Sequence, residues 1–136
     1  MAQQILLIKL EKPREKKLDQ DIHWLCNSFG LSSGRDTENL ATKIVMDLLE
    51  QMSGSEEKVS SEKIAESLDV NPSRVNHHVR NLINSGLLYR ERRRLCLRGG
   101  SLKAAVQEMR KDSERIFNEL EEIAEEIDRQ MGLKNR

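Results

Sequence analysis

The side chains best suited to chemistry lie between positions 71 and 100, which hold seven arginines and one acidic residue. Arginine keeps its charge and carries a planar fork of N–H donors, which matches phosphate oxygens and the edge of guanine. Arg92, Arg93 and Arg94 are consecutive, and Arg74 and Arg80 lie among polar residues upstream. The chain as a whole is neutral, with 23 basic and 23 acidic residues. The local excess therefore indicates a polyanion, and nucleic acid in particular, although an ordinary solvated surface is the alternative.

The elements that position these arginines are predicted to be two short helices, a tight turn and a hairpin, over residues 59–98. Asn71 and Pro72 predict the start of the second helix, because an Asn side chain caps free N–H groups and proline fits the first helical position. Gly86 predicts its end. The apolar residues of the two helices recur at helical spacing and are Ile64, Ala65, Leu68, Val75, Val79, Leu82 and Ile83. This pattern is typical of a helix-turn-helix with a wing, which places its second helix in the DNA major groove.

The polar face of the second helix supplies the candidate contacts. Arg74, Asn76 and His77 are predicted to read base edges, because they lie near the start of the helix. For Asn76 an ordinary polar face is the alternative. Phosphate or groove contacts are expected from a second set, namely Ser60, Ser61, Ser73, Arg80, Arg92, Arg93 and Arg94. For Ser60 and Ser61, simple capping of the preceding helix is an equal alternative. His78 is expected to be a packed structural histidine.

The wing is predicted to turn near Arg92–Arg93, with Arg90 and Arg98 on its flanks. Leu95 and Leu97 are expected to face the core and Cys96 to face outward, because side chains alternate along a strand. The tip has neither glycine nor asparagine, so the type of turn stays open. Val59 is expected to form a short strand that pairs with this wing.

The segment before the helix-turn-helix is predicted to hold a strand over residues 4–10 and a helix from about 14 to 28. The helix is expected to bury Leu18, Ile22, Leu25 and, less clearly, Trp24. Residues 28–35 read as a loop. Asp36 or Thr37 is expected to cap the next helix, whose apolar positions are Leu40, Ile44, Val45, Leu48 and Leu49.

After Gly100 the sequence has a heptad pattern, interrupted only at Ser113. Its apolar positions are Leu102, Val106, Met109, Ile116, Leu120, Ile123 and Ile127. A helix over residues 102–131 would be on the order of 45 Å long at about 1.5 Å per residue. A helix of this length is longer than the surface that its own small domain offers for packing. These seven residues are therefore predicted to form a dimerisation seam, combined with packing on the N-terminal helix, and burial within one subunit is the alternative.

Composition excludes several classes of protein. With 136 residues, 3% aromatic and 34% charged, the chain suits one domain with a thin core plus an extension. The two cysteines have no paired spacing, which fits a reducing compartment. The longest apolar run, residues 5–8, is too short to span a bilayer or to act as a signal peptide. We therefore expect a cytoplasmic protein without membrane contacts.

Neither catalysis nor a metal site is predicted. The sequence has no nucleophile constellation, acid/base pair or glycine-rich phosphate loop, so an enzyme is not expected. His23 and Cys26 are three residues apart and share a helix face, but two ligands are too few for a four-coordinate metal. Cys26 is therefore expected in the core. No cofactor is expected.

The motifs IAESLDV and SRVNHHVRNLINSGLL, followed by the arginine-rich hairpin, resemble the winged helix-turn-helix of ArsR-type transcription regulators, which are related in architecture to the MarR group. His78-Val79, Leu82 and Gly86-Leu87-Leu88 match the family's pattern. The stretch RGGSLKAAVQEM is similar to the dimerisation helix of short ArsR-like proteins common in archaea. Metal-responsive relatives carry paired cysteines on the helix before the turn, and SSEKIAESL has none.

The sequence thus predicts a mainly α fold with a small β-hairpin wing. Its parts are an N-terminal extension (1–35), a winged helix-turn-helix domain (36–100) and a coiled-coil-like dimerisation helix (101–136). The expected function is a homodimeric, sequence-specific regulator of transcription on a roughly palindromic site of double-stranded DNA, with no effector indicated. The alternative is a winged helix that contacts an acidic protein within a transcription or chromatin assembly.

Overall fold

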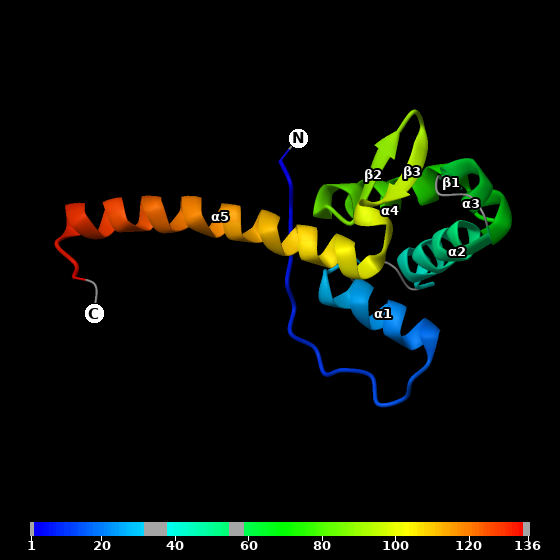
Figure 1. Cartoon of the computed structure of the whole chain (residues 1–136), viewed down its shortest axis with the longest axis horizontal. Helices are drawn as coiled ribbons and strands as arrows, with labels where there is room; N and C mark the ends of the chain where they lie inside the picture. The colour runs from blue at the N-terminus through cyan, green and yellow to red at the C-terminus, as the bar shows by residue number, and fades with distance from the viewer. Residues whose placement is uncertain (1, 32–37, 55–58, 135–136) are drawn as a thin grey trace.

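A computed structural model of the chain describes residues 2–31, 38–54 and 59–134. It is mainly helical, with one small antiparallel sheet and a long C-terminal helix (Figure 1), so the predicted fold class is confirmed. The elements are α1 (Leu18–Ser28), α2 (Leu40–Gly54), β1 (Val59–Ser60), α3 (Ser61–Leu68), α4 (Pro72–Ser85), β2 (Leu88–Glu91), β3 (Arg94–Leu97), the short 3-10 helix η1 (Arg98–Gly100) and α5 (Leu102–Met131). No helix of the described residues has the length and the apolar character needed to cross a membrane.

The helix-turn-helix forms as the local sequence predicts. The Ser60 hydroxyl caps α3 by accepting the Lys63 N–H at 3.1 Å, and the Asn71 side chain caps α4 by accepting the Ser73 N–H at 2.9 Å. Asp69 ends α3 with a left-handed φ of 53°, and Gly86 ends α4 with a φ of 96°. These caps fix the two helices relative to the turn.

The core lies between α2, α3, α4 and the sheet. Ile44, Ile64, Val75, Leu82 and Leu95 are all fully buried there. The expected apolar stripes of α2 and α4 are confirmed, with Leu49 and Ile83 packed at the edge of the cluster. This core holds α4 and the β2–β3 hairpin against each other.

The sheet has the order β1-β3-β2, and Val59 pairs with Leu95, as predicted. Leu95 and Leu97 belong to the core, but the outward placement predicted for Cys96 is wrong, because Cys96 is only 4% exposed. β3 is the central strand, and Cys96 is a small side chain opposite the larger Tyr89. The hairpin turns at Arg92 and Arg93, as predicted, and both have positive φ values of 50° and 69°.

The N-terminal segment contradicts the prediction of a strand over residues 4–10. Residues 2–17 form neither helix nor strand, and two of their backbone N–H groups bond to carbonyls elsewhere in the chain. The Gln4 N–H donates to the Asn84 carbonyl at 3.0 Å, and the Ile8 N–H donates to the Ser28 carbonyl at 2.8 Å. These acceptors lie at the ends of α4 and α1 rather than on a strand, so no ladder forms.

Helix α1 begins about one turn later than predicted, at Leu18. Ile22 and Cys26 are buried as expected, and Trp24 and Leu25 are half-buried. The predicted burial of Leu18 is wrong, because its side chain is 65% exposed at the first position of the helix. The predicted caps at Asp36 and Thr37 lie outside the described residues.

Helix α5 covers the predicted residues 102–131 and consists of two halves with different surroundings. Ala105 and Met109 are buried against the core, and Leu102 packs at its edge. Beyond Asp112 the helix leaves the body of the molecule and projects into solvent (Figure 1). Met109 therefore belongs to the core of its own subunit, which corrects its assignment to an intersubunit seam.

Candidate nucleic-acid interface

The outer face of α4 carries the residues predicted to read bases. Arg74 and His77 are exposed, Asn76 is half-buried, and Arg80 is exposed one turn further on. Beneath them Val75 and Val79 are fully buried, so the packing of α4 fixes which face remains outside. The predicted orientation of the helix is therefore correct, whereas base contact itself stays a prediction.

Arg74 has a partner that the sequence did not reveal. Its Nη2 donates to Glu38 Oε2 at 2.9 Å, and the side chains are 52% and 57% exposed. Because both side chains are largely exposed, solvent screens this ion pair, and it contributes little to the stability of the fold. Glu38 precedes α2 and lies 36 positions from Arg74, a separation at which no local pattern links the two.

The wing and the recognition helix also contact each other. Arg90 on β2 lies with Nη2 at 3.5 Å from Asn76 Oδ1 on α4. This places one predicted base-reading residue beside a wing arginine that was not among the predicted contacts. The two elements consequently present one continuous polar surface.

Of the three serines predicted to bind phosphate, Ser60 and Ser73 form hydrogen bonds within the local structure. Ser60 caps α3, and the Ser73 hydroxyl donates to Asn71 Oδ1 at 2.9 Å. Ser61 is half-buried at the first position of α3. Capping therefore accounts for Ser60, and phosphate contact by any of the three stays a prediction.

The two histidines of α4 diverge as helical geometry requires. His77 is exposed and His78 is half-buried, and their rings meet edge to face with centroids 5.4 Å apart. His78 thus lies on the inner side of the helix, as predicted, and His77 remains available at the surface.

The wing arginines divide into two groups. Arg92, Arg93 and Arg94 are exposed around the tip. Arg98, at the base, points inward and donates through Nη2 to Asp112 Oδ1 at 3.0 Å. The bond to Arg98 holds the pKa of Asp112 well below its usual range, and Asp112 in turn raises the pKa of Arg98. Arg98 therefore joins the wing to α5, a role that sequence reasoning missed because the partner lies on another element.

His23 and Cys26 occupy the positions considered for a metal. Cys26 is fully buried in the core, as predicted. The two ring nitrogens of His23 lie 3.0 Å from Thr42 Oγ1 and 2.9 Å from Asn27 Nδ2, so both have protein partners. The described part of the chain contains no group of three or more His, Cys, Asp or Glu side chains that could hold a metal.

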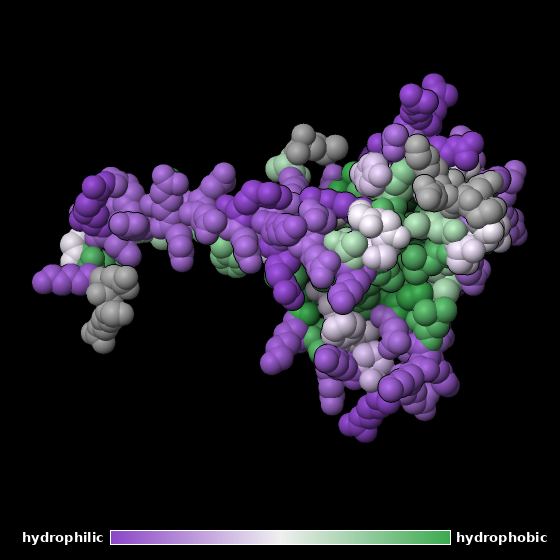
Figure 2. Space-filling model, viewed as in Figure 1, coloured by the Kyte–Doolittle hydropathy of each residue, from purple (hydrophilic) through white to green (hydrophobic). Residues whose placement is uncertain are grey.

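The residues predicted for dimerisation fall into a proximal and a distal group. Leu102 and Val106 are half-buried beside the domain. The distal group is open to solvent, with exposed fractions of 37% for Ile116, 57% for Leu120, 62% for Ile123 and 55% for Ile127. In Figure 2 this half is mostly hydrophilic, with hydrophobic patches on one side.

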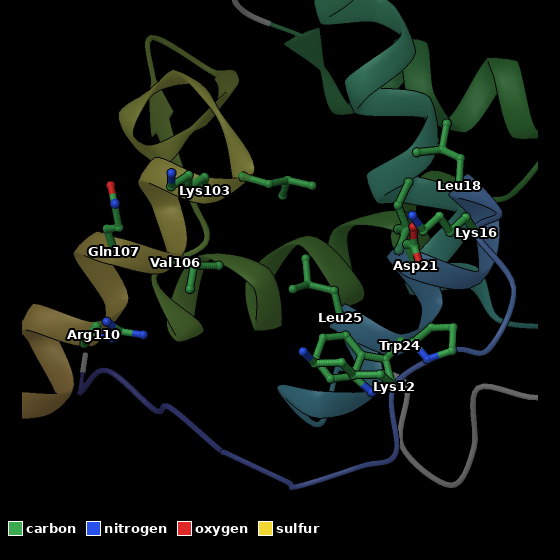
Figure 3. A pocket seen from close by; sticks show the side chains of 13 residues that line it. Lys12, Lys16, Leu18, Asp21, Trp24, Leu25, Lys103, Val106, Gln107 and Arg110 are labelled. Carbon is green, nitrogen blue, oxygen red and sulfur yellow. The ribbon is translucent and has the colours of Figure 1, made fainter.

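A groove of about 820 Å³ lies between α1, the N-terminal segment and the proximal half of α5. Figure 3 shows Leu25 on α1 and Val106 on α5 projecting into the space between the two helices. Its charged lining residues are Lys12, Lys16, Asp21, Lys103 and Arg110. We call this space the α1–α5 groove.

Residues 42–90, from the first turn of α2 to the middle of β2, match the family described as bacterial regulatory protein, arsR family. The chain carries an ArsR-type helix-turn-helix domain. This confirms the resemblance expected from the sequence and supports a role for the chain as a DNA-binding regulator of transcription. The matched residues contain α3, α4 and most of β2, so they include the polar face of α4. Neither a curated protein nor a solved structure matches the chain.

Proposed function

We propose that the chain binds double-stranded DNA as a homodimer and regulates transcription by occupying a roughly palindromic site. The observation that carries this proposal is the surface formed by α4, which lies within the ArsR-type domain, and by the wing that directly follows it. Arg74, His77 and Arg80 are exposed on the helix, and the tip of the wing adds three exposed arginines. In this class of fold the second helix enters the major groove, and arginines of a wing lie along phosphates or the minor groove.

The homodimer is supported by the distal half of α5. Its four seam residues are between 37% and 62% exposed, on a helix that no other described element covers. Apolar side chains repeated at heptad spacing along one face are typical of helices that pair. A second copy would cover them, and two recognition helices related by the dimer axis would face half-sites about one helical turn apart.

Selection of bound duplexes from a random library tests this proposal. We expect enrichment of a site with two inverted half-sites, and a stoichiometry of two chains per duplex in sedimentation. Specific binding should exceed binding to random duplex by about 1,000-fold or more at physiological salt. Equal affinity for all duplexes, or binding only to an acidic protein, would contradict it.

A further inference from the structure

Arg90 on β2 determines the orientation of the Asn76 side chain on α4. Its Nη2 donates to Asn76 Oδ1 at 3.5 Å. A guanidinium carries only N–H donors, so the opposite orientation would turn the amide NH2 group of Asn76 against these donors. The contact is long and therefore weak, but it is attractive in one orientation and repulsive in the other. The amide oxygen of Asn76 thus faces the wing, and its NH2 group is left for another partner.

The fold of the domain, rather than the contact itself, brings the two residues together. Val75 and Val79 are fully buried, so they fix the rotation of α4 and with it the direction of Asn76. Leu88, at the start of β2, is only 2% exposed and fixes the strand that carries Arg90. Asn76 is half-buried in the first half of α4, and Arg90 is exposed. The pair is therefore preformed on the surface expected to face the major groove.

The orientation of the amide decides which base edge Asn76 can bind. A free asparagine pairs with adenine through both of its groups, because its oxygen accepts from the N6 amino group and its NH2 group donates to N7. With Arg90 at the oxygen, an adenine amino group at the same atom would meet the positive charge of the guanidinium. Guanine presents two acceptors, N7 and O6, in the major groove. The donors of Asn76 and Arg90 both match this edge.

We propose that Asn76 and Arg90 act as a unit that selects guanine rather than adenine at one position of the bound site, with Arg90 as the positioning residue. This inference rests on the proposed binding to double-stranded DNA and specifies what the recognition helix reads. Thymine offers a single acceptor beside a methyl group, and cytosine offers a donor, so both fit the pair less well than guanine. Arg90 thus acts in base selection and not only in contact with the DNA backbone.

Selection of duplexes from a random library by variant chains tests the proposal. Asn76→Ala identifies the position that Asn76 reads, because the preference at that position should disappear. The unmodified chain should bind guanine there about tenfold more tightly than adenine. Arg90→Met keeps a long side chain but removes its donors, so the amide can turn and adenine should be bound at least as tightly as guanine.

Arg94→Met is the matched control for Arg90→Met. It removes the same charge from an exposed position on the neighbouring strand β3. It should weaken binding to all duplexes and leave the choice between guanine and adenine unchanged. Helical circular dichroism confirms that each variant is folded.

The double variant tests whether Arg90 acts through Asn76. Once Asn76→Ala is present, adding Arg90→Met should not change the relative affinity for guanine and adenine any further. A guanine preference that survives Asn76→Ala and is lost only with Arg90→Met would show that Arg90 reads the base alone, which contradicts the proposal.

A modified base gives an independent measurement. A duplex with 7-deazaguanine at the selected position lacks the N7 acceptor, so the unmodified chain should bind it roughly fivefold more weakly. Asn76→Ala should bind the two duplexes equally. An equal loss in both chains would assign the N7 contact to another residue and contradict the proposal.

The failure of this inference differs from the failure of the proposed function. Adenine preferred by the unmodified chain, or a guanine preference that Arg90→Met leaves intact, would overturn the inference while sequence-specific binding remains. An Asn76→Ala chain that keeps every base preference would do the same. Equal affinity of the unmodified chain for all duplexes would overturn sequence-specific binding itself.

Discussion

Arg98, at the end of the wing, and Asp112, on α5, form an ion pair in which the carboxylate is almost fully buried, with the Asp112 side chain 6% exposed. Asp112 accepts two further hydrogen bonds, from Gln3 Nε2 at 2.8 Å and from Arg115 Nη2 at 2.6 Å. Gln3 also donates to the Ser85 carbonyl at the end of α4. A single carboxylate thus joins the wing, the recognition helix, the N-terminal segment and the long helix.

Replacing Asp112 with Asn should lower the free energy of unfolding by about 2 kcal/mol at neutral pH, because the charged hydrogen bonds disappear. Arg98 then keeps only the more distant carboxylate of Glu108, whose Oε2 lies 4.0 Å from its Nη2. The pKa of Asp112 is lowered in the folded state. The ionised Asp112 side chain therefore contributes fully to stability above its pKa in the unfolded state, about 3.9. This contribution is lost as the pH falls through the lower pKa of the folded state. Denaturant titrations between about pH 7 and pH 3 should show the difference between the two proteins shrinking in acid.

The control for this prediction is Asp128→Asn, an exposed carboxylate on the same helix. It should leave stability nearly unchanged over the whole pH range. A constant difference between Asp112→Asn and the unmodified chain down to the lowest pH would mean that the substitution acts through packing rather than through charge.

The wing should provide phosphate contacts that do not depend on sequence. Replacing Arg92, Arg93 and Arg94 with Ala should weaken binding to every duplex. The slope of log affinity against log salt should fall by about one for each phosphate that the wing no longer neutralises. Titrations at several salt concentrations measure this slope. Lys111→Ala, which removes an exposed cation from α5, is the control, and an unchanged slope in the wing variant would exclude the tip from the interface.

Base reading is expected from Arg74 and Asn76. An Ala at either position should cost roughly 1–3 kcal/mol on the preferred duplex and relax the choice of one or two bases. Competition between the preferred and a random duplex is the measurement. An equal weakening on both duplexes would show that these side chains anchor phosphates instead.

Glu38 should oppose binding, because it occupies the guanidinium of Arg74 at 2.9 Å and adds negative charge beside the recognition helix. Glu38→Gln should strengthen binding to the preferred duplex by about two- to fivefold, which corresponds to about 0.5–1 kcal/mol. Glu62→Gln, a comparable change on the exposed face of α3, is the control. The prediction fails if the gain is the same for both variants or absent from both.

The distal half of α5 should be essential for assembly and dispensable for folding of the domain. Leu120→Asp places a charge in the proposed interface, where desolvation costs several kcal/mol. The dimer should dissociate at micromolar concentration in sedimentation, and DNA affinity should fall with it. Because Leu120 is 57% exposed in the single chain, helical circular dichroism should change little. Asn118→Asp adds the same charge on the outer side of the helix and should leave the dimer intact.

Local signals predicted the parts of the fold that local physics determines. Asn71, Pro72 and Gly86 defined α4 because capping and backbone geometry act over a few residues. The heptad spacing predicted the bounds of α5. The strand predicted over residues 4–10 does not form. Side chains that favour β-structure produce a strand only where a neighbouring strand provides hydrogen-bond partners, and here the neighbouring backbone belongs to the ends of helices.

The candidate site was also predictable only where local sequence patterns determine it. The outward face of α4 follows from the stripe of Val75 and Val79, which helical periodicity reveals. The partners Glu38 and Asp112 were not predictable, since each meets its arginine through tertiary structure. Met109 fitted the heptad as well as its neighbours did, and only the packing of the domain assigns it to the core.

The tip of the wing combines a high positive charge with an unfavourable backbone conformation. Arg92 and Arg93 both have positive φ, a conformation that costs an ordinary residue roughly 1–2 kcal/mol and that Asn-Gly adopts readily. Replacing these arginines with turn-forming residues such as Asn-Gly would therefore stabilise the hairpin and remove two positive charges from it. The two arginines at the tip therefore keep positive charge where DNA is expected to approach, at a cost in the stability of the hairpin.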